Sequence, residues 1–327
     1  MKSFVLRGAW SATALLVCWL GMGPASAQAP YPNQPIKFLV PYPPGGLPDT
    51  TARIVALRLQ ERIGHNVVIE NRPGGASSVA VGALLAAPAD GYTFIVTDGA
   101  IMSANPALFK DKLAYNPKDL VPTAFIGRAP LFLAVHPKLP VNTLQEFIDY
   151  VKARPGQINY GSSGIGSVHH LSMEAMKAAL GLKMTHVPYR GTQQSVPALL
   201  GGHVDVIFSA YPSLVAAVEG KLVKLLATNG SKRFPQAPDV PALAEIIPGY
   251  DLATIVGLFA RVGTPPALIE KLSAEAVAGA GHPDAVKAFT ANGIEPALGG
   301  PDAFARALQA EVDYVNKVVA DAGIKIE

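Results

Sequence analysis

A short apolar run, a glycine-containing turn and a helical segment follow one another repeatedly along this chain, and this repetition constrains the fold most. The first instance is an apolar run at 36–40, a turn at 43–46 and apolar residues at helical spacing over 47–63. Residues 158–180 and 184–200 repeat the pattern. Strands that alternate with helices in this way predict an α/β fold.

Each of these turns lies where a helix begins, which makes it a candidate anion site. Free backbone N–H groups at a helix N-terminus bind carboxylates and phosphates, and glycine lets the anion approach. Pro48 and Asp49 suit the first turn of the first helix, and Ser167 is a good N-cap for the helix predicted over 168–180. On spacing alone, an ordinary β–α turn remains an alternative reading of each motif.

Two long extended runs interrupt the alternation. They cover residues 124–136 and 253–260, and each has the length to carry the chain from one lobe to another. A chain of about 300 residues after export suits two lobes at the usual domain size. We therefore predict lobe I from residues 28–128 plus 255–327, and lobe II from residues 129–254.

The N-terminal segment has the parts of a secretory signal peptide. Lys2 and Arg7 precede an apolar segment at 9–22, and an A-x-A site ends at Ala27. The apolar segment is shorter than the roughly 20 residues that span a bilayer, which disfavours a membrane anchor. Cys18 lies inside that segment, which disfavours a lipoprotein. We predict cleavage after Ala27 and a periplasmic mature protein.

The composition of the mature chain excludes several classes of protein. Removal of residues 1–27 takes away the single cysteine, so disulfides cannot stabilise what remains. It also removes Lys2 and Arg7 from the 27 basic residues, which leaves 25 against 24 acidic residues. A nearly neutral chain gives no sign of binding to nucleic acid or to a membrane surface, and we expect no nucleic-acid partner.

The loop at 161–167 invites two enzymatic readings, and both lack a residue that they need. A nucleophile elbow requires G-x-S-x-G, but Ile165 stands where the last glycine belongs after Ser163. A dinucleotide fingerprint requires a third glycine where His169 stands. We predict no catalytic residues, and a secreted hydrolase of the α/β class remains the alternative.

The histidine pair on the following helix is a weak metal candidate. His169 and His170 are adjacent, so their side chains point about 100° apart. His170 and Glu174 lie four residues apart and could supply only two ligands. We predict no metal and no cofactor, with His169 facing the Gly/Ser loop and His170 packed or solvated.

Arg190 is the strongest candidate for a charged contact to an anion. A guanidinium beside a helix N-terminus binds a carboxylate in bidentate fashion, although a surface arginine in a loop fits the spacing equally well. The Thr192 hydroxyl follows at the start of the next predicted helix. Asp205 is suited to binding a polar ligand group or to pairing with Arg190.

Several motifs occur in one order along the chain, and together they carry a family resemblance. They are Pro43-Pro44-Gly45-Gly46-Leu47-Pro48-Asp49 with Ala52-Arg53, Glu70-Asn71-Arg72-Pro73-Gly74, Asp90-Gly91-Tyr92-Thr93, Gly164-Ile165-Gly166-Ser167 with His169, His186-Val187-Pro188-Tyr189-Arg190-Gly191 and Gly263-Thr264-Pro265. The chain resembles the Bug-type (TctC-like) substrate-binding proteins of tripartite tricarboxylate transporters. The resemblance covers essentially the whole mature chain.

The resemblance implies a two-lobed periplasmic binding-protein fold of the type II-like class. Each lobe would hold a mixed sheet flanked by helices, with the ligand cleft between the lobes. The ligand would be a small mono-, di- or tricarboxylate, aromatic ones included. The partners would be the large and small integral-membrane subunits of a transporter, with a membrane sensor kinase as an alternative receiver. We expect a monomer that acts as a binding protein and not as an enzyme.

The motifs and the family's loops give one set of candidate ligand-binding residues. The set is Tyr42, Pro44, Gly45, Gly46, Asp49, Thr97, Asp98, Ser162, Ser163, Gly164, Ser167, His169, Arg190, Thr192 and Asp205. Asp98 departs from the family's pattern, because an acidic side chain would repel a carboxylate. We also expect Gly46→Val to weaken binding more than Asp49→Asn, because a β-branched residue resists a left-handed turn.

Overall fold

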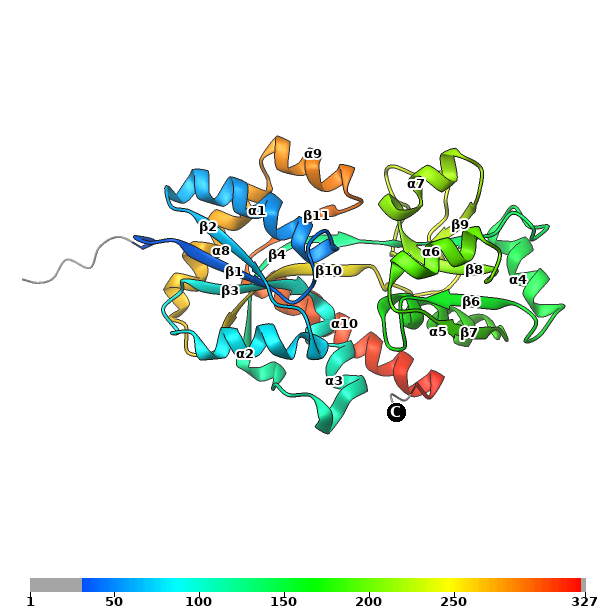
Figure 1. Ribbon diagram of the computed structural model, residues 1–327, viewed down its shortest axis with the longest axis horizontal. Helices are drawn as coiled ribbons and strands as arrows, with labels where there is room; N and C mark the ends of the chain where they lie inside the picture. Colours follow the sequence, from blue (N-terminus) through cyan, green and yellow to red (C-terminus); the bar gives the residue numbers. More distant parts are fainter. Residues whose placement is uncertain (1–30, 325–327) are drawn as a thin grey trace, which may run out of the picture.

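The computed structural model describes residues 31–324, and these form two α/β lobes joined side by side (Figure 1). Each lobe is built around one β-sheet. The predicted signal peptide and its cleavage site lie outside the described residues. Within residues 31–324, no helix combines the length and the apolar character that crossing a bilayer requires.

The first lobe contains a six-stranded mixed sheet in the order β11-β4-β10-β3-β1-β2. Its strands are β1 (Ile36–Val40), β2 (Val67–Asn71), β3 (Thr93–Asp98), β4 (Leu120–Ala129), β10 (Thr254–Arg261) and β11 (Glu295–Gly299). Strand β1 pairs in parallel with β2 and β3, whereas β10 runs antiparallel to β3 and β4. The loops after β1 and β3 therefore leave the same edge of the sheet, which is where ligands bind in open α/β folds.

Helices cover both faces of this sheet because the strands are buried on both sides. One face packs against α1 (Leu47–Ile63), α8 (Pro266–Ala280) and α9 (Pro283–Ala291). The other face packs against α2 (Ser78–Ala86) and α10 (Pro301–Ala322). The short helix α3 (Ala104–Phe109) follows β3 and leads toward the second lobe.

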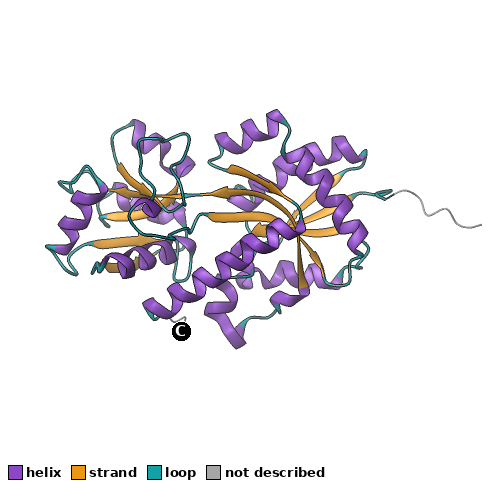
Figure 2. Cartoon of the chain, turned by 180° about the vertical axis from the view of Figure 1, so that it is seen from behind, coloured by secondary structure: helices purple, strands orange, loops and turns teal. Residues whose placement is uncertain are grey.

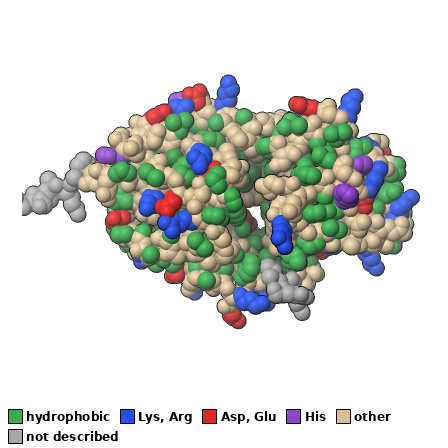
Figure 3. Space-filling view, in the orientation of Figure 1, with side chains coloured by type: hydrophobic (Ala, Val, Ile, Leu, Met, Phe, Trp, Pro, Cys, Tyr) green, Lys and Arg blue, Asp and Glu red, His purple; other side chains and the backbone are tan. Residues whose placement is uncertain are grey.

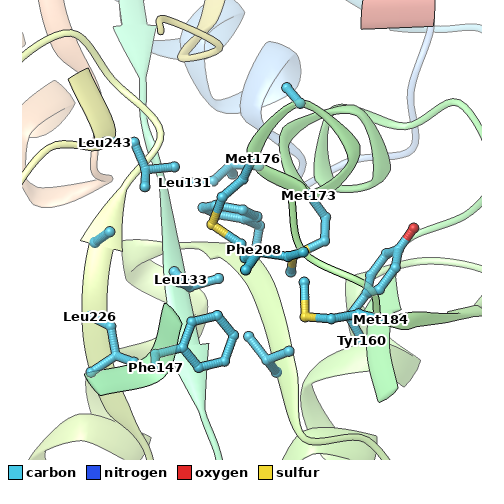
Figure 4. Close-up of a cluster of buried hydrophobic side chains, with 14 of the residues drawn as sticks. Leu131, Leu133, Phe147, Tyr160, Met173, Met176, Met184, Phe208, Leu226 and Leu243 are labelled. Carbon is cyan, nitrogen blue, oxygen red and sulfur yellow. The ribbon is translucent and has the colours of Figure 1, made fainter. Parts of the chain in front are cut away.

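The second lobe has a five-stranded mixed sheet in the order β7-β6-β8-β5-β9. Its strands are β5 (Leu131–Val135), β6 (Asn159–Ser162), β7 (Thr185–Pro188), β8 (Val206–Ala210) and β9 (Lys224–Thr228). Its helices are α4 (Leu144–Lys152), α5 (Val168–Leu180), α6 (Thr192–Leu200) and α7 (Tyr211–Glu219). Figure 4 shows the core on the α4 and α5 face, where Phe147 of α4, Met176 of α5 and Phe208 of the sheet belong to one apolar cluster.

The chain crosses between the sheets at the two extended runs that the sequence singled out. The first run is not one strand, because Pro130, which has no N–H to donate, separates β4 from β5. The second run returns the chain to the first sheet as β10. Asn229 ties the two crossings together and is fully buried: its Oδ1 accepts from the Leu131 amide at 2.6 Å, and its Nδ2 donates to the Leu252 carbonyl at 2.8 Å.

Helix α10 reaches across to the second lobe (Figure 2). Val315 and Val318 from its second half, together with Ala104 and Leu108 of α3, belong to the same apolar cluster as the α5 side of the second sheet. Its first half, through Phe304, belongs to the first lobe. The C-terminal helix therefore covers the first sheet and also forms part of the contact between the lobes.

The predicted elements match the structure closely, with two omissions. Helices α1 and α5 begin and end at the predicted residues. The sequence analysis gave no element at α3, which is only one and a half turns long, or at β11, which contains Pro296 and ends in glycine. Both lack the apolar periodicity that reveals longer elements.

We predict that Asn229→Ala lowers the free energy of unfolding by about 2–5 kcal/mol. The substitution leaves the Leu131 amide and the Leu252 carbonyl buried without their partners, at a cost of about 1–3 kcal/mol each, and it also leaves a cavity. Urea denaturation followed by circular dichroism measures the change. Ser231→Ala, two residues away and exposed, is the matched control and should unfold like the unchanged protein. Equal stability of the two variants would contradict the role given to Asn229.

Candidate ligand-binding cleft

A cavity of about 520 Å³ lies between the two lobes, and both lobes supply its walls (Figure 3). Its size suits a small molecule. The first lobe contributes the ends of β1 and β3, helix α3, and residues from β10 and α10, and the second lobe contributes the loop before α5 and the segment before β10. The lining residues are Tyr42, Ala76, Asp98, Ala100, Ser103, Ala104, Asn105, Leu108, Phe109, Ser163, Gly164, Ile165, Gly166, Ser167, Val168, His169, Leu171, Leu252, Ala253, Thr254, Glu311 and Val315.

The N-terminus of α5 forms the wall of the second lobe. Ser167 is the N-cap, as predicted, and its Oγ accepts from the His170 amide and donates to the Gly164 carbonyl at 2.7 Å. The first N–H groups of a helix, here those of Val168 and His169, have no partner within the helix. They lie in the cavity lining together with the Ser163 hydroxyl, so this wall presents hydrogen-bond donors and the positive end of a helix dipole.

Three histidines hold the loop before α5 in place through hydrogen bonds. Ser163 Oγ bonds His169 Nδ1 at 2.7 Å, Ser162 Oγ bonds His186 Nε2 at 2.7 Å, and the Gly166 amide donates to His170 Nδ1 at 3.1 Å. His170 is buried and stacks on His186 with ring centroids 4.1 Å apart. His170 is thus packed, and His169 faces the loop, as the sequence analysis expected.

Burial keeps these histidines neutral. It lowers the pKa of His169 to about 4 and is also the largest cause that lowers the pKa of His186 to about 4. The pKa of His170 is lowered by burial as well, against the opposing charge of Glu174. A neutral His169 contributes a hydrogen bond to the wall but no positive charge.

The wall of the first lobe carries an acidic side chain at the end of β3. Asp98 caps the turn that follows, because its Oδ1 accepts from the Ala100 amide at 3.1 Å. Burial raises the pKa of Asp98, while hydrogen bonds from Tyr42 and the Ala100 amide act in the opposite direction. Burial, together with the same contact to Asp98, raises the pKa of Tyr42 well above its usual value.

A second acidic side chain, Glu311, enters the cavity from α10. Its carboxyl lies directly against Gly99, where a Cβ would stand 2.4 Å from Oε2, so a larger residue at position 99 would displace the Glu311 carboxyl. Ser103 Oγ lies 2.5 Å from Glu311 Oε1. Burial raises the pKa of Glu311 to about 8, with the charges of Asp98 and Asp251 adding to the effect and Ser103 and Arg128 opposing it.

The loop after β1 is arranged differently from the prediction. Asp49 is buried and accepts from the Gly45 amide at 2.9 Å, from Arg53 and from Asn71. Burial opposes its ionised form, but these hydrogen bonds outweigh that effect and lower the pKa of Asp49. Gly46 has φ −77°, which any residue adopts, and the positive φ of +88° belongs to Gly45. The argument that Gly46→Val is excluded by a left-handed turn is therefore wrong.

Six of the candidate residues line the cavity, and nine lie outside its lining. Those in the lining are Tyr42, Asp98, Ser163, Gly164, Ser167 and His169, and those outside it are Pro44, Gly45, Gly46, Asp49, Thr97, Ser162, Arg190, Thr192 and Asp205. Arg190 is exposed. The Asp205 carboxylate pairs with Lys138 at 3.1 Å and accepts from the Asn159 amide. The suggested pairing of Asp205 with Arg190 is therefore wrong, because Lys138 is the cation that lies beside this carboxylate.

The sequence analysis missed the contributions of α3 and α10 to the cavity. Ser103 is the N-cap residue of the short helix α3, and Asn105 and Phe109 belong to it. Glu311 lies more than 200 residues from Asp98 along the chain. The sequence pattern of an amphipathic C-terminal helix predicts that its glutamates are exposed to solvent. The one sequence signal was Gly99, because a glycine after a buried strand can mark a close approach of another element.

The arrangement of titratable groups argues for binding. Ser163 and His169 form a hydrogen-bonded pair, but burial makes His169 a weak base, and no carboxylate hydrogen-bonds to its ring within residues 31–324. Within the same residues, no group of three or more histidine, cysteine, aspartate or glutamate side chains is placed to hold a metal ion.

Comparisons with known proteins identify the group to which this architecture belongs. The family model described as "Tripartite tricarboxylate transporter family receptor" matches residues 51–324. The chain belongs to this receptor family. BugT of Bordetella pertussis is 31% identical over 306 residues, which cover 93% of this chain and 94% of BugT.

Solved structures of similar proteins agree with the fold. The R. palustris protein Rpa4515, solved with adipate, is 33% identical, has a TM-score of 0.80, and matches over 90% of this chain and 99% of its own. The periplasmic binding protein BugD is 27% identical with a TM-score of 0.76, over 91% of this chain and 100% of its own. The chain is thus a Bug-type receptor with the two-lobed α/β fold of periplasmic binding proteins.

We predict that the free energy of unfolding falls as the pH drops from about 6.5 to about 4. Native His169 and His186 stay neutral down to a pKa of about 4, while the unfolded chain takes up protons from 6.5 downward. Denaturation at a series of pH values measures the slope, and His186→Gln should reduce it. His203→Gln, at an exposed position, is the control and should leave the slope unchanged. A slope that His186→Gln does not alter would contradict a half-buried His186 that stays neutral in the folded protein.

Proposed function

We propose that this protein captures a small carboxylate in the cleft between its lobes and presents it to the membrane subunits of a tripartite tricarboxylate-type transporter. The observation that carries the proposal is the N-terminus of α5, whose free amides and Ser163 hydroxyl line the cavity. Family membership and the adipate in the structure of Rpa4515 support the same ligand class.

The ligand's carboxylate would lie against the first turn of α5. There it accepts from the Val168 and His169 amides and from Ser163, and the helix dipole favours its charge. No arginine or lysine belongs to the cavity lining, all of which lies within residues 31–324. Main-chain N–H groups at the N-terminus of α5 therefore bind the carboxylate, a role that an arginine or lysine side chain has in many other carboxylate sites.

The location and partners follow from this role. Export through the predicted signal peptide, with cleavage after Ala27, would place the receptor in the periplasm. The division into residues 28–128 plus 255–327 and residues 129–254 would allow one lobe to move against the other around the crossings that Asn229 ties. We infer that the large and small membrane subunits receive the ligand from this monomer and that no catalytic step occurs.

A deletion of one backbone donor tests the proposal. Val168 is the first residue of α5, and proline is tolerated at this position because its φ suits the helix. The preceding Ser167 has φ −65° and ψ 157°, which a following proline accepts. Val168→Pro thus removes one N–H from the proposed site with little change to the fold. Val168→Ala is the matched control, because it shortens the side chain and keeps the N–H.

We predict that Val168→Pro weakens carboxylate binding about tenfold, while Val168→Ala changes it little. A thermal-shift screen of mono-, di- and tricarboxylates, adipate included, first identifies a ligand of the unchanged protein. Calorimetry then gives the affinity of each variant. Equal affinities for both variants would show that the α5 amides do not hold the carboxylate, and chemical conversion of the ligand during incubation would favour the hydrolase reading.

A further inference from the structure

The two walls of the cavity differ in the hydrogen-bonding groups that they leave free. On the wall of the first lobe, the side-chain donors of Tyr42 and Asn105 already donate to acceptors of the protein itself. The Tyr42 hydroxyl donates to Asp98, and Asn105 Nδ2 donates to the Ala76 carbonyl at 2.9 Å. A ligand that meets this wall therefore finds these side-chain donors already in use.

Ser103 shows how the remaining donor on this wall is used. Its Oγ lies 3.0 Å from the Gly99 carbonyl and 2.5 Å from Glu311 Oε1, yet a hydroxyl has only one proton to donate. Both contacts are satisfied together when Ser103 donates to Gly99 and Glu311 carries a proton that it donates to Ser103. The raised pKa of Glu311 agrees with a proton on this carboxyl when the cavity is empty.

The free groups on the first wall are acceptors, whichever protonation state Glu311 adopts. Glu311 Oε2 is buried and has no hydrogen-bond partner within residues 31–324. Asp98, on the same wall, presents carboxyl oxygens that accept only from Tyr42 and Ala100 among the described residues. The lining contains no lysine or arginine, and His169 is neutral, so no protein charge balances Asp98 inside the cavity.

We propose that the ligand is a small zwitterion, with a carboxylate at the α5 N-terminus and a cationic nitrogen at the Asp98–Glu311 pair. The inference rests on the proposed function and names its substrate class. The cationic nitrogen supplies donors and a positive charge to the carboxyl groups of Asp98 and Glu311 in a site of low dielectric constant. A dicarboxylate would instead place its second carboxylate against these acceptors.

Ligands that differ in one terminal group test the proposal. Hexanoate, adipate and 5-aminopentanoate share a carboxylate followed by four methylene groups, and they end in a methyl, a carboxylate and an ammonium group. Butanoate, succinate and 3-aminopropanoate form a shorter set of the same kind. We expect the amino acid to bind at least about tenfold more tightly than the other members of the set that fits the cavity.

Two isosteric variants reverse this preference if the acidic pair recognises the nitrogen. Asp98→Asn and Glu311→Gln each replace a carboxyl with an amide that can donate, so the amino acid should bind more weakly and the dicarboxylate more tightly. Melting temperatures confirm that the variants are folded. Glu270→Gln, at an exposed site on α8 outside the cavity, is the charge-matched control and should keep the preference of the unchanged protein.

Proton exchange gives an independent readout. A bound cation favours the ionised form of Glu311, whose pKa of about 8 is set by burial together with Ser103, Asp98, Arg128 and Asp251. Binding of the amino acid near neutral pH should therefore release a proton, and its affinity should rise with pH up to about 8. Calorimetry in two buffers with different ionisation enthalpies measures the proton release, which Glu311→Gln should abolish.

The outcomes separate this inference from the proposed function. Tighter binding of the amino acid, reversed by the two variants, supports the inference. Binding of adipate or succinate as tight as that of the matching amino acid, or a preference that the variants leave unchanged, overturns it while the receptor function stands. The same holds if a wider screen finds only carboxylates without a cationic nitrogen. Failure of every carboxylate to bind would overturn both.

Discussion

The buried side chain of Asn229 is the constraint on which the cleft depends. The chain passes between the two sheets twice, and the contacts of α3 and α10 with the second lobe add to these extended crossings. Asn229 satisfies the backbone of both crossings at once, at Leu131 and at Leu252, and its Nδ2 also reaches Ser172 Oγ at 2.9 Å on α5. One residue thus links the crossings to the helix whose N-terminus lines the cavity.

The two walls of the cavity present opposite kinds of hydrogen-bonding group. The second lobe ends a strand in a Gly/Ser loop and starts α5, so its wall offers amide donors in a loop that neutral histidines hydrogen-bond. The first lobe ends β3 in Asp98 and receives Glu311 from α10, so its wall offers acceptors. The polarity of the cavity follows from where a helix begins and where a distant helix passes, without any basic side chain in the lining.

The parts of this arrangement that local patterns encode could be predicted from the sequence. Apolar runs ending in glycine turns revealed the strands and helices, and Ser167 marked the start of α5 because serine is a favourable N-cap. Glu311 and Ser103 could not be found in this way, because their role arises only when α10 folds back onto the loop after β3. The same limit explains Arg190 and Asp205: residue type suggested an anion site and an ion pair, but neither side chain lines the cavity. The left-handed turn expected at Gly46 was wrong for a different reason. Of two adjacent glycines, the sequence cannot tell which one has the positive φ.

A crystal structure of the protein with a carboxylate that raises its melting temperature tests the central claim most directly. The account predicts carboxylate oxygens within hydrogen-bond distance of the Val168 and His169 amides and the Ser163 hydroxyl, between the two lobes. A carboxylate bound instead at Arg190, or at the exposed turn around Gly45 outside the cavity, would contradict it.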